Sequence, residues 1–174
     1  MVSTNTITFK PPWRQNSMLI VATSLSNHPN DKQEAEPTLR ALPVELGKPN
    51  AAALDAGFFS AANIHLMDGL GIEPYIATGR EAHHQDLNVL LGKMPEAPAA
   101  EASPKEKMAY KLATEIGRTV YRLRKCTVEP VIGIIKEIMG FRQFSLRGLI
   151  KVTGEWCLVC LTFNLKRMHI LMTG

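Results

Sequence analysis

The sequence contains 174 residues, a length that allows one domain, and 45% of them are hydrophobic. No run approaches the roughly 18 apolar residues of a membrane helix, and three cysteines, an odd number, argue against a disulfide framework. The N-terminal residues are not typical of a secretory signal, because their apolar run is too short. We therefore expect a cytoplasmic protein with no membrane partner.

Charge is distributed unevenly along the chain. Residues 1–103 carry 7 Lys/Arg and 11 Asp/Glu, whereas residues 104–174 carry 13 Lys/Arg and 5 Asp/Glu. A strongly basic C-terminal part favours a polyanionic partner, with nucleic acid as the first candidate. Solvated helix faces would account for the same charges equally well.

The first half of the sequence alternates predicted strands and helices. Residues 1–16 are polar and aperiodic and contain Pro11-Pro12, so we expect a leader that is either disordered or unrelated in origin to the rest of the chain. The elements that follow are a strand at 17–24, a helix at 31–46 split by prolines, a strand at 51–55, a helix at 61–70 capped by Ser60 and a strand at 72–77. Such alternation predicts an α/β fold with a short, mainly parallel sheet.

The second half is predicted to be helical. Residues 80–103 are rich in Ala, Pro and Glu, which is typical of a variable surface loop. Three helices are then expected, at 104–125, 127–139 and 146–168, with Pro130 separating the first two and Gly140 ending the second.

Asp55 is the first candidate for chemistry. It lies at the predicted carboxyl end of a strand, the edge of an open α/β sheet where ligands bind. A carboxylate at that edge could hold a divalent metal ion. An aspartate beside a glycine, here Gly57 two residues on, is also common in turns that bind nothing.

Glu129 is the second candidate. It precedes Pro130 at the expected start of a helix, where the helix dipole would favour an ionised carboxylate. The cations Arg122, Arg124 and Lys125 precede it closely, so Glu129 could be a metal ligand or an ion-pair partner. Lys136 follows seven residues later, on the same face of a regular helix.

The segment VEPVIGIIKEIMGFRQFSLRGLIKVTGEWCLVCLTFNLKRMH resembles the C-terminal end of bacterial insertion-sequence DDE transposases. LDAGFFSAANI followed by EPYIATGR resembles the region of the family's second aspartate, and NHPNDKQEAEPTL the segment before it. The resemblance runs from about residue 17 to residue 169 and implies an incomplete RNase H-like fold with a basic helical C-terminal region.

The resemblance also implies roles for particular residues. Asp55 would match the second catalytic aspartate and Glu129 the catalytic glutamate, both as ligands of Mg²⁺ or Mn²⁺ in DNA strand cleavage and transfer. DNA phosphates would be held by residues around that glutamate, namely Tyr121, Arg122, Arg124, Lys125 and Lys136. Arg124 and Lys125 are both candidates for the arginine of the family signature.

One feature departs from the family pattern. The first catalytic aspartate belongs upstream of residue 17, yet residues 1–16 contain no Asp or Glu. We therefore expect an N-terminally truncated, nucleoid-associated transposase that is inactive alone. Its expected partner is the DNA of insertion-sequence ends, and an intact transposase is a second candidate partner. The alternative is a non-enzymatic protein that binds DNA or inhibits an intact transposase.

Other residues are weaker candidates. Cys157 and Cys160 have C-x2-C spacing, but no second pair accompanies them and a core role is favoured over zinc binding. Trp156 could stack on DNA bases, although its apolar surroundings favour the core. The dipeptide His83-His84 falls in the variable loop, where surface residues are the simpler interpretation.

Overall fold

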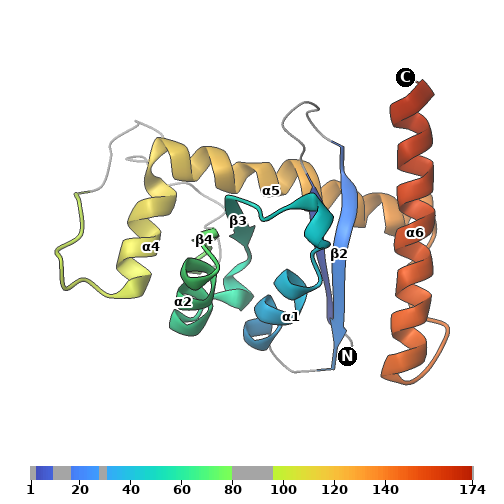
Figure 1. The fold of residues 1–174 in the computed structure, drawn as a ribbon, viewed down its shortest axis with the longest axis horizontal. Coiled ribbons are helices and arrows are strands. Elements are labelled where there is room, and N and C mark those ends of the chain that lie inside the picture. The colour runs from blue at the N-terminus through green and yellow to red at the C-terminus, as the bar shows by residue number, and fades with distance from the viewer. Residues whose placement is uncertain (1–2, 10–16, 28–30, 80–95, 174) are drawn as a thin grey trace. The chain divides into compact units, whose positions relative to one another are not determined.

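A computed structural model describes residues 3–9, 17–27, 31–79 and 96–173, with the backbone alone for 3–9 and 125–127 (Figure 1). The chain divides into two compact units. Residues 1–47 and 125–174 form the discontinuous unit, and residues 48–124 form the continuous unit. Each unit is described by itself below, and the single domain expected from residue 17 onward stays a prediction.

The discontinuous unit begins with an antiparallel strand pair. Strand β1 (Ser3–Phe9) pairs with β2 (Leu19–Ser26), in a register that shifts between Ile7 and Thr8. The expectation of a disordered leader is thus wrong for residues 3–9. Their sequence, STNTITF, is polar but rich in β-branched residues, which suit a pleated strand even without an apolar run.

The segment after β2 is broken into short turns of helix, as the prolines predicted. It contains η1 (Asp31–Gln33), α1 (Ala35–Arg40) and η2 (Val44–Leu46). A hydrogen bond of 2.6 Å between the hydroxyls of Ser24 and Thr38 joins β2 to α1. Leu39 is buried, so this short helix covers part of the strand pair.

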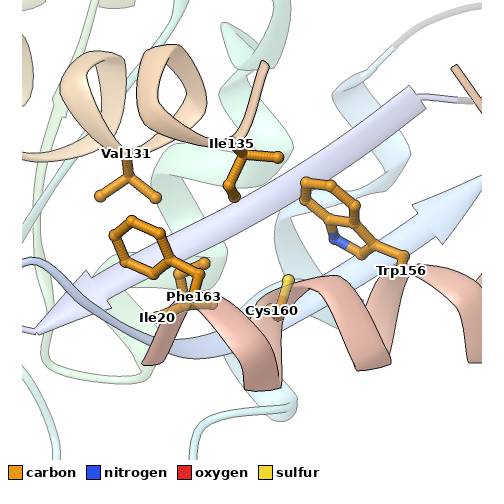
Figure 2. Packing of buried hydrophobic residues seen from close by; sticks show 6 residues of the cluster. All are labelled: Ile20, Val131, Ile135, Trp156, Cys160 and Phe163. Carbon is orange, nitrogen blue, oxygen red and sulfur yellow. The ribbon is translucent and has the colours of Figure 1, made fainter. Parts of the chain in front are cut away.

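Two long helical segments follow in the second half of the chain, and the first of them begins in the continuous unit and ends in the discontinuous unit. Helix α5 (Glu115–Gly133) continues into a π-helical turn, η4 (Ile134–Ile138), and α6 (Leu149–Thr173) lies beside β2 (Figure 1). The third helix, expected at 146–168, therefore begins and ends later than predicted. Its later start follows Gly148, whose positive φ of 87° lies outside the helical range. The core between these elements gathers large side chains, Ile20, Val131, Ile135, Trp156, Cys160 and Phe163 (Figure 2).

The continuous unit contains a second small sheet. Strands β3 (Ala51–Leu54) and β4 (Glu73–Ile76) pair in parallel, with Ala51 opposite Glu73. Between them run η3 (Ala56–Phe58) and α2 (Ala61–Gly69). The predicted cap is confirmed, because the Ser60 side chain accepts a hydrogen bond from the Asn63 amide at 3.1 Å.

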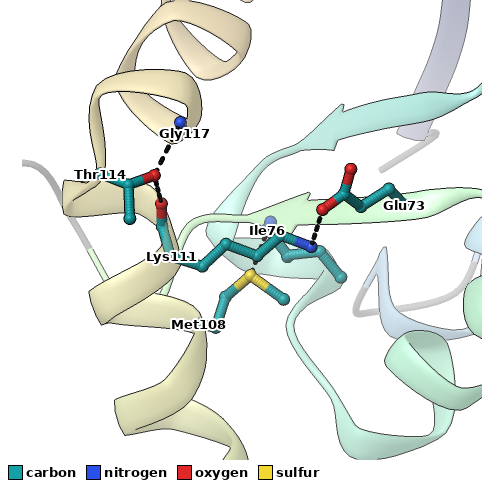
Figure 3. A network of polar contacts seen from close by, with 6 residues as sticks. All are labelled: Glu73, Ile76, Met108, Lys111, Thr114 and Gly117. Atoms are coloured by element: carbon teal, nitrogen blue, oxygen red, sulfur yellow. Dashed lines mark hydrogen bonds and ion pairs between the residues drawn. The ribbon is translucent and has the colours of Figure 1, made fainter. Parts of the chain in front are cut away.

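Helix α4 (Pro104–Ala113) packs on β4 through three different contacts, two of which, those of Met108 and of Lys111 with Glu73, are drawn in Figure 3. The Ile76 amide donates to the Met108 sulfur at 3.5 Å. The Lys111 ammonium lies 2.9 Å from the Glu73 carboxylate and 4.5 Å from the centre of the Tyr75 ring. Polar and cation–π contacts thus accompany a single buried apolar side chain of α4, Met108.

The helix expected at 104–125 is interrupted at Thr114, where α4 ends and α5 begins. The Thr114 hydroxyl donates to the Lys111 carbonyl at 2.7 Å and accepts from the Gly117 amide at 3.0 Å (Figure 3). A Cβ atom at Gly117 would lie 1.9 Å from that carbonyl oxygen. Only glycine therefore fits this corner without a shift of the backbone.

The sheet topology corrects one expectation and confirms another. The strand predicted at 17–24 pairs in the antiparallel β1–β2 sheet, so parallel pairing holds only for β3 with β4. The reason is the unforeseen β1, which provides β2 with a neighbour. The fold is mixed α/β, and no described helix has the length and apolar character needed to cross a bilayer.

Candidate functional site

Asp55 lies where the sequence placed it, directly after β3. Its backbone is extended, with φ −69° and ψ 163°, and its carbonyl accepts a hydrogen bond from the Phe58 amide at 3.0 Å. The turn of η3 therefore begins at this residue and fixes its backbone. The carboxylate consequently stands at the carboxyl end of a parallel strand, the edge that commonly binds ligands.

The Asp55 carboxylate forms an ion pair with Arg124 of α5, and the two side chains are 2.5 Å apart. The Arg124 side chain is only 17% exposed, whereas that of Asp55 is 59% exposed. The guanidinium also lies 5.5 Å from the centre of the Tyr121 ring. A charge-assisted hydrogen bond and a cation–π contact together orient this arginine.

Three of the predicted site residues are thus brought together, Asp55, Tyr121 and Arg124, all within the continuous unit. Sequence reasoning selected each of them but missed the pairing. Asp55 and Arg124 belong to different elements, far apart in the chain, and no local pattern links them. The ion pair between them is a finding of the structure alone.

The other predicted DNA contacts are more scattered. Arg122 is exposed on α5, and in the sequence it falls between Tyr121 and Arg124, which form the cation–π pair. Lys136 is exposed on η4, in the discontinuous unit. The side chain of Lys125 lies outside the described residues.

Glu129 is exposed, but its predicted position at a helix start is wrong. Helix α5 runs through Pro130 without interruption, so Glu129 lies in its last turns rather than at its N-terminus. The positive end of the helix dipole is therefore not beside this carboxylate. A π turn then follows in place of the regular helix expected up to Lys136, and such turns are frequent at functional sites.

The described residues do not by themselves form a metal site. None of their His, Cys, Asp or Glu side chains gather in a group of three or more that could hold a metal ion. The Asp55 carboxylate is engaged by a guanidinium, which satisfies its charge without a cation from solution. The two-metal arrangement implied by the resemblance therefore does not fit these residues alone.

Of the remaining candidates, Trp156 is a core residue, 3% exposed, as favoured from the sequence. Cys160 is buried, and burial raises the pKa of its thiol to about 12, which disfavours the thiolate that binds zinc. Cys157 is exposed, against the expectation that both cysteines are buried. The pair His83-His84 lies outside the described residues.

Residues 92–169 match a family described as "Transposase DDE domain". No curated protein and no solved structure matches the chain. The matched range includes Glu129 and the predicted DNA-binding residues, whereas Asp55 lies before it. DDE transposases act on DNA and typically use divalent metal ions. The match thus supports a DDE transposase family and a transposase function for this chain.

Proposed function

We propose that the chain is the C-terminal part of the RNase H-like catalytic domain of an insertion-sequence transposase. The observation that carries this proposal is the match of residues 92–169 to the transposase domain, which includes Glu129. The match favours a transposase over the alternative of a non-enzymatic DNA-binding or inhibitory protein. Asp55 and Glu129 are the catalytic carboxylates of this proposal.

The surroundings of Asp55 support its role. It stands at the carboxyl end of β3, and the partly buried Arg124 provides a fixed positive charge beside it. An arginine held in this way also presents N–H groups suited to a phosphate oxygen. We propose that Arg124 alternates between the Asp55 carboxylate and a phosphate of bound DNA.

The basic C-terminal part supplies the DNA-binding surface in this proposal. Residues 104–174 hold 13 Lys/Arg against 5 Asp/Glu, and Arg122 and Lys136 are both exposed. Contacts of these cations with phosphates would make affinity depend on salt and little on sequence. Insertion-sequence ends are the proposed target.

The chain alone is proposed to be catalytically incomplete. Residues 1–30 contain no Asp or Glu, so neither β1 nor β2 carries a candidate for the first catalytic aspartate. In this proposal the third carboxylate of the DDE site is supplied by another polypeptide. An intact transposase is one source, and divalent metal would then bind only in the joint assembly.

DNA binding tests the function directly. Fluorescence anisotropy with a labelled duplex at several salt concentrations should show affinity that falls steeply as salt rises. Arg122→Ala and Lys136→Ala should each lower the salt slope by about 1, because each removes one phosphate contact. Arg40→Ala is the matched control, since Arg40 is an exposed cation paired with Glu36 on α1. Equal effects of all three variants would contradict the proposed surface.

Metal binding and cleavage test the incomplete site. Thermal unfolding of the chain with millimolar Mg²⁺ or Mn²⁺ should show little stabilisation, and DNA should remain uncleaved. A marked metal-dependent rise of the melting temperature, lost in Asp55→Asn and Glu129→Gln but not in Glu137→Gln, would show that two carboxylates suffice for binding. Cleavage by the chain alone would overturn the proposed incompleteness.

A further inference from the structure

A pocket of about 300 Å³ lies in the continuous unit, where α2 and α4 both contact β4 (Figure 1). Its lining side chains come from the two helices and from Pro74, the second residue of β4. Ligand pockets range from roughly 300 to 1,000 Å³, so this one suits a small molecule. Neither Asp55 nor Arg124 lines it, and the pocket is therefore a further candidate site.

Most of the lining is apolar. Pro74 and Met108 are buried at the pocket, Ile64 is half-buried, and Pro104 is exposed at its edge. The Met108 sulfur is held in place because it accepts a hydrogen bond from the Ile76 amide at 3.5 Å (Figure 3). These flexible or ring-shaped aliphatic groups offer dispersion contacts to an aliphatic group of a ligand.

Charged groups of opposite sign border the same pocket. Asp68 belongs to α2, whereas Lys107 and Lys111 belong to α4. Lys111 is already paired with Glu73, at 2.9 Å. The Lys107 ammonium donates one hydrogen bond, to the Ala100 carbonyl at 2.7 Å, so among the described residues two of its three N–H groups have no acceptor.

The Asp68 carboxylate is the matching negative group. It has no ion pair or hydrogen bond with any residue that the structure describes. An unpaired carboxylate on one helix and a partly unpaired ammonium on the other, both beside an aliphatic lining, complement a molecule that carries both charges and an aliphatic group. A free amino acid has this combination within one small molecule.

We propose that this pocket binds a free α-amino acid with an aliphatic side chain. Its carboxylate accepts hydrogen bonds from Lys107, its ammonium donates to Asp68, and its side chain lies against Ile64 and Met108. Charge-assisted hydrogen bonds fix both charged ends. Because three groups on one carbon are held, the site should prefer one enantiomer. A ligand of so few atoms with partly exposed ion pairs binds weakly, so we expect a dissociation constant of about 1 mM.

NMR titration of the full chain with L-leucine tests the proposal. Backbone amide signals of Ile64 and Lys107 should shift and saturate, with half-saturation near about 1 mM. D-leucine should bind more weakly, which a nonspecific contact with apolar surface would not show. The absence of a saturable shift with L-leucine up to about 20 mM would overturn the proposal.

Two leucine derivatives test the charges of the ligand. N-acetyl-L-leucine lacks the ammonium group and L-leucinamide lacks the carboxylate, and each should bind at least about twofold to fivefold more weakly than L-leucine. If either derivative binds as tightly as L-leucine, the pocket takes a peptide end or an apolar group instead, and the assignment to a free amino acid is wrong.

Substitutions at the two charged residues test the contacts from the protein side. Asp68→Asn and Lys107→Met should each raise the dissociation constant of L-leucine by about twofold to fivefold. Lys105→Met is the matched control, because Lys105 is exposed on α4 but does not line the pocket. Equal effects of Lys105→Met and Lys107→Met would contradict the proposed contact.

Filling the pocket provides a test that does not depend on charge. Ala61 is exposed, lines the pocket and begins α2, whereas its exposed neighbour Ala62 does not line it. Ala61→Phe should abolish the shifts caused by L-leucine, and Ala62→Phe should leave them unchanged. Circular dichroism melting checks that both variants remain folded. Normal binding in Ala61→Phe, or its loss in both folded variants, would place the ligand elsewhere and refute the site.

Discussion

The two units of this chain are held together by different kinds of side-chain contact. The discontinuous unit surrounds Trp156 with aliphatic side chains and with two further aromatic rings, Phe141 and Phe144, whose centres lie 6.0 and 6.2 Å from it. The continuous unit docks α4 on β4 through a thioether, Met108, and an ammonium group, Lys111. The first unit depends on packing of large apolar groups, and the second adds polar contacts at a helix–strand junction.

This difference predicts which substitutions should lower the stability of each unit. Loss of a buried ring leaves a cavity that a close-packed core cannot refill. Loss of a polar contact at a partly exposed junction costs less, because water replaces part of it, but it makes stability depend on pH. Four substitutions test this difference between the units, and they are given in decreasing order of the expected loss of stability.

Trp156→Ala should have the largest effect. Removal of this buried indole should lower the free energy of unfolding by about 3–5 kcal/mol. Hydrogen exchange followed by mass spectrometry should show lost protection in β2 and α6, with β3 and β4 little changed. Trp156→Phe, which keeps a ring, should cost clearly less. Equal loss of protection in both units would contradict the contrast.

Gly117→Ala should destabilise the continuous unit by about 1–3 kcal/mol, because the new methyl group would overlap the Lys111 carbonyl. Gly133→Ala is the matched control, since nothing lies within 4 Å of the Cβ position there. Alanine is the better helix former, so this control should be neutral or stabilising. Chemical denaturation of both variants measures the free energy of unfolding. Similar decreases in the two variants would contradict the steric restriction at Gly117.

Ser103→Ala should cost about 1 kcal/mol by removing the N-cap of α4. Ser103 and Glu106 form a capping box in which each side chain binds the other residue's backbone amide. Ser103→Asp keeps a capping oxygen and should retain most of the stability in urea unfolding. If both substitutions lower the free energy of unfolding equally, the Ser103 cap does not stabilise this helix.

Lys111→Met should have the smallest effect at neutral pH, below about 1 kcal/mol, because Glu73 is more than half exposed. Its signature is pH dependence. The hydrogen bond with Lys111 lowers the pKa of Glu73 below its usual range. The stabilisation is complete above the unfolded-state pKa and is lost as the pH falls through the folded-state pKa.

Unfolding of the unaltered chain should therefore lose stability between about pH 5 and pH 3 more steeply than Lys111→Met. NMR titration of the Glu73 carboxyl carbon provides the direct check. A Glu73 pKa that does not rise in Lys111→Met would show that the ion pair has no effect in solution.

Local sequence signals predicted local features well. The cap at Ser60 and the position of Asp55 after a strand were read correctly, because each depends on a few neighbouring residues. The start of α4 at Pro104 was likewise confirmed. Such features follow from the chemistry of capping and from short hydrophobic runs.

Features that depend on distant residues were not predicted. The ion pair of Asp55 with Arg124 joins separate elements, and the pairing of β1 with β2 rests on a strand without an apolar run. Pro130 was expected to end a helix, yet the packing of Val131 and Ile135 in the core holds the chain helical through it. Thr114 was expected to continue a helix, yet its hydroxyl caps a new one.

The discontinuous unit also has a consequence for how the protein is made. On the ribosome, β2 emerges early, but Asn164, which hydrogen-bonds to Ile20, follows 144 residues later. At about 5–20 residues per second, the strand waits roughly 7–30 s for its partner on α6. The continuous unit, residues 48–124, is synthesised in the meantime. The nascent chain therefore exposes the apolar residues of the β1–β2 pair during this interval, which makes it a natural client for co-translational chaperones.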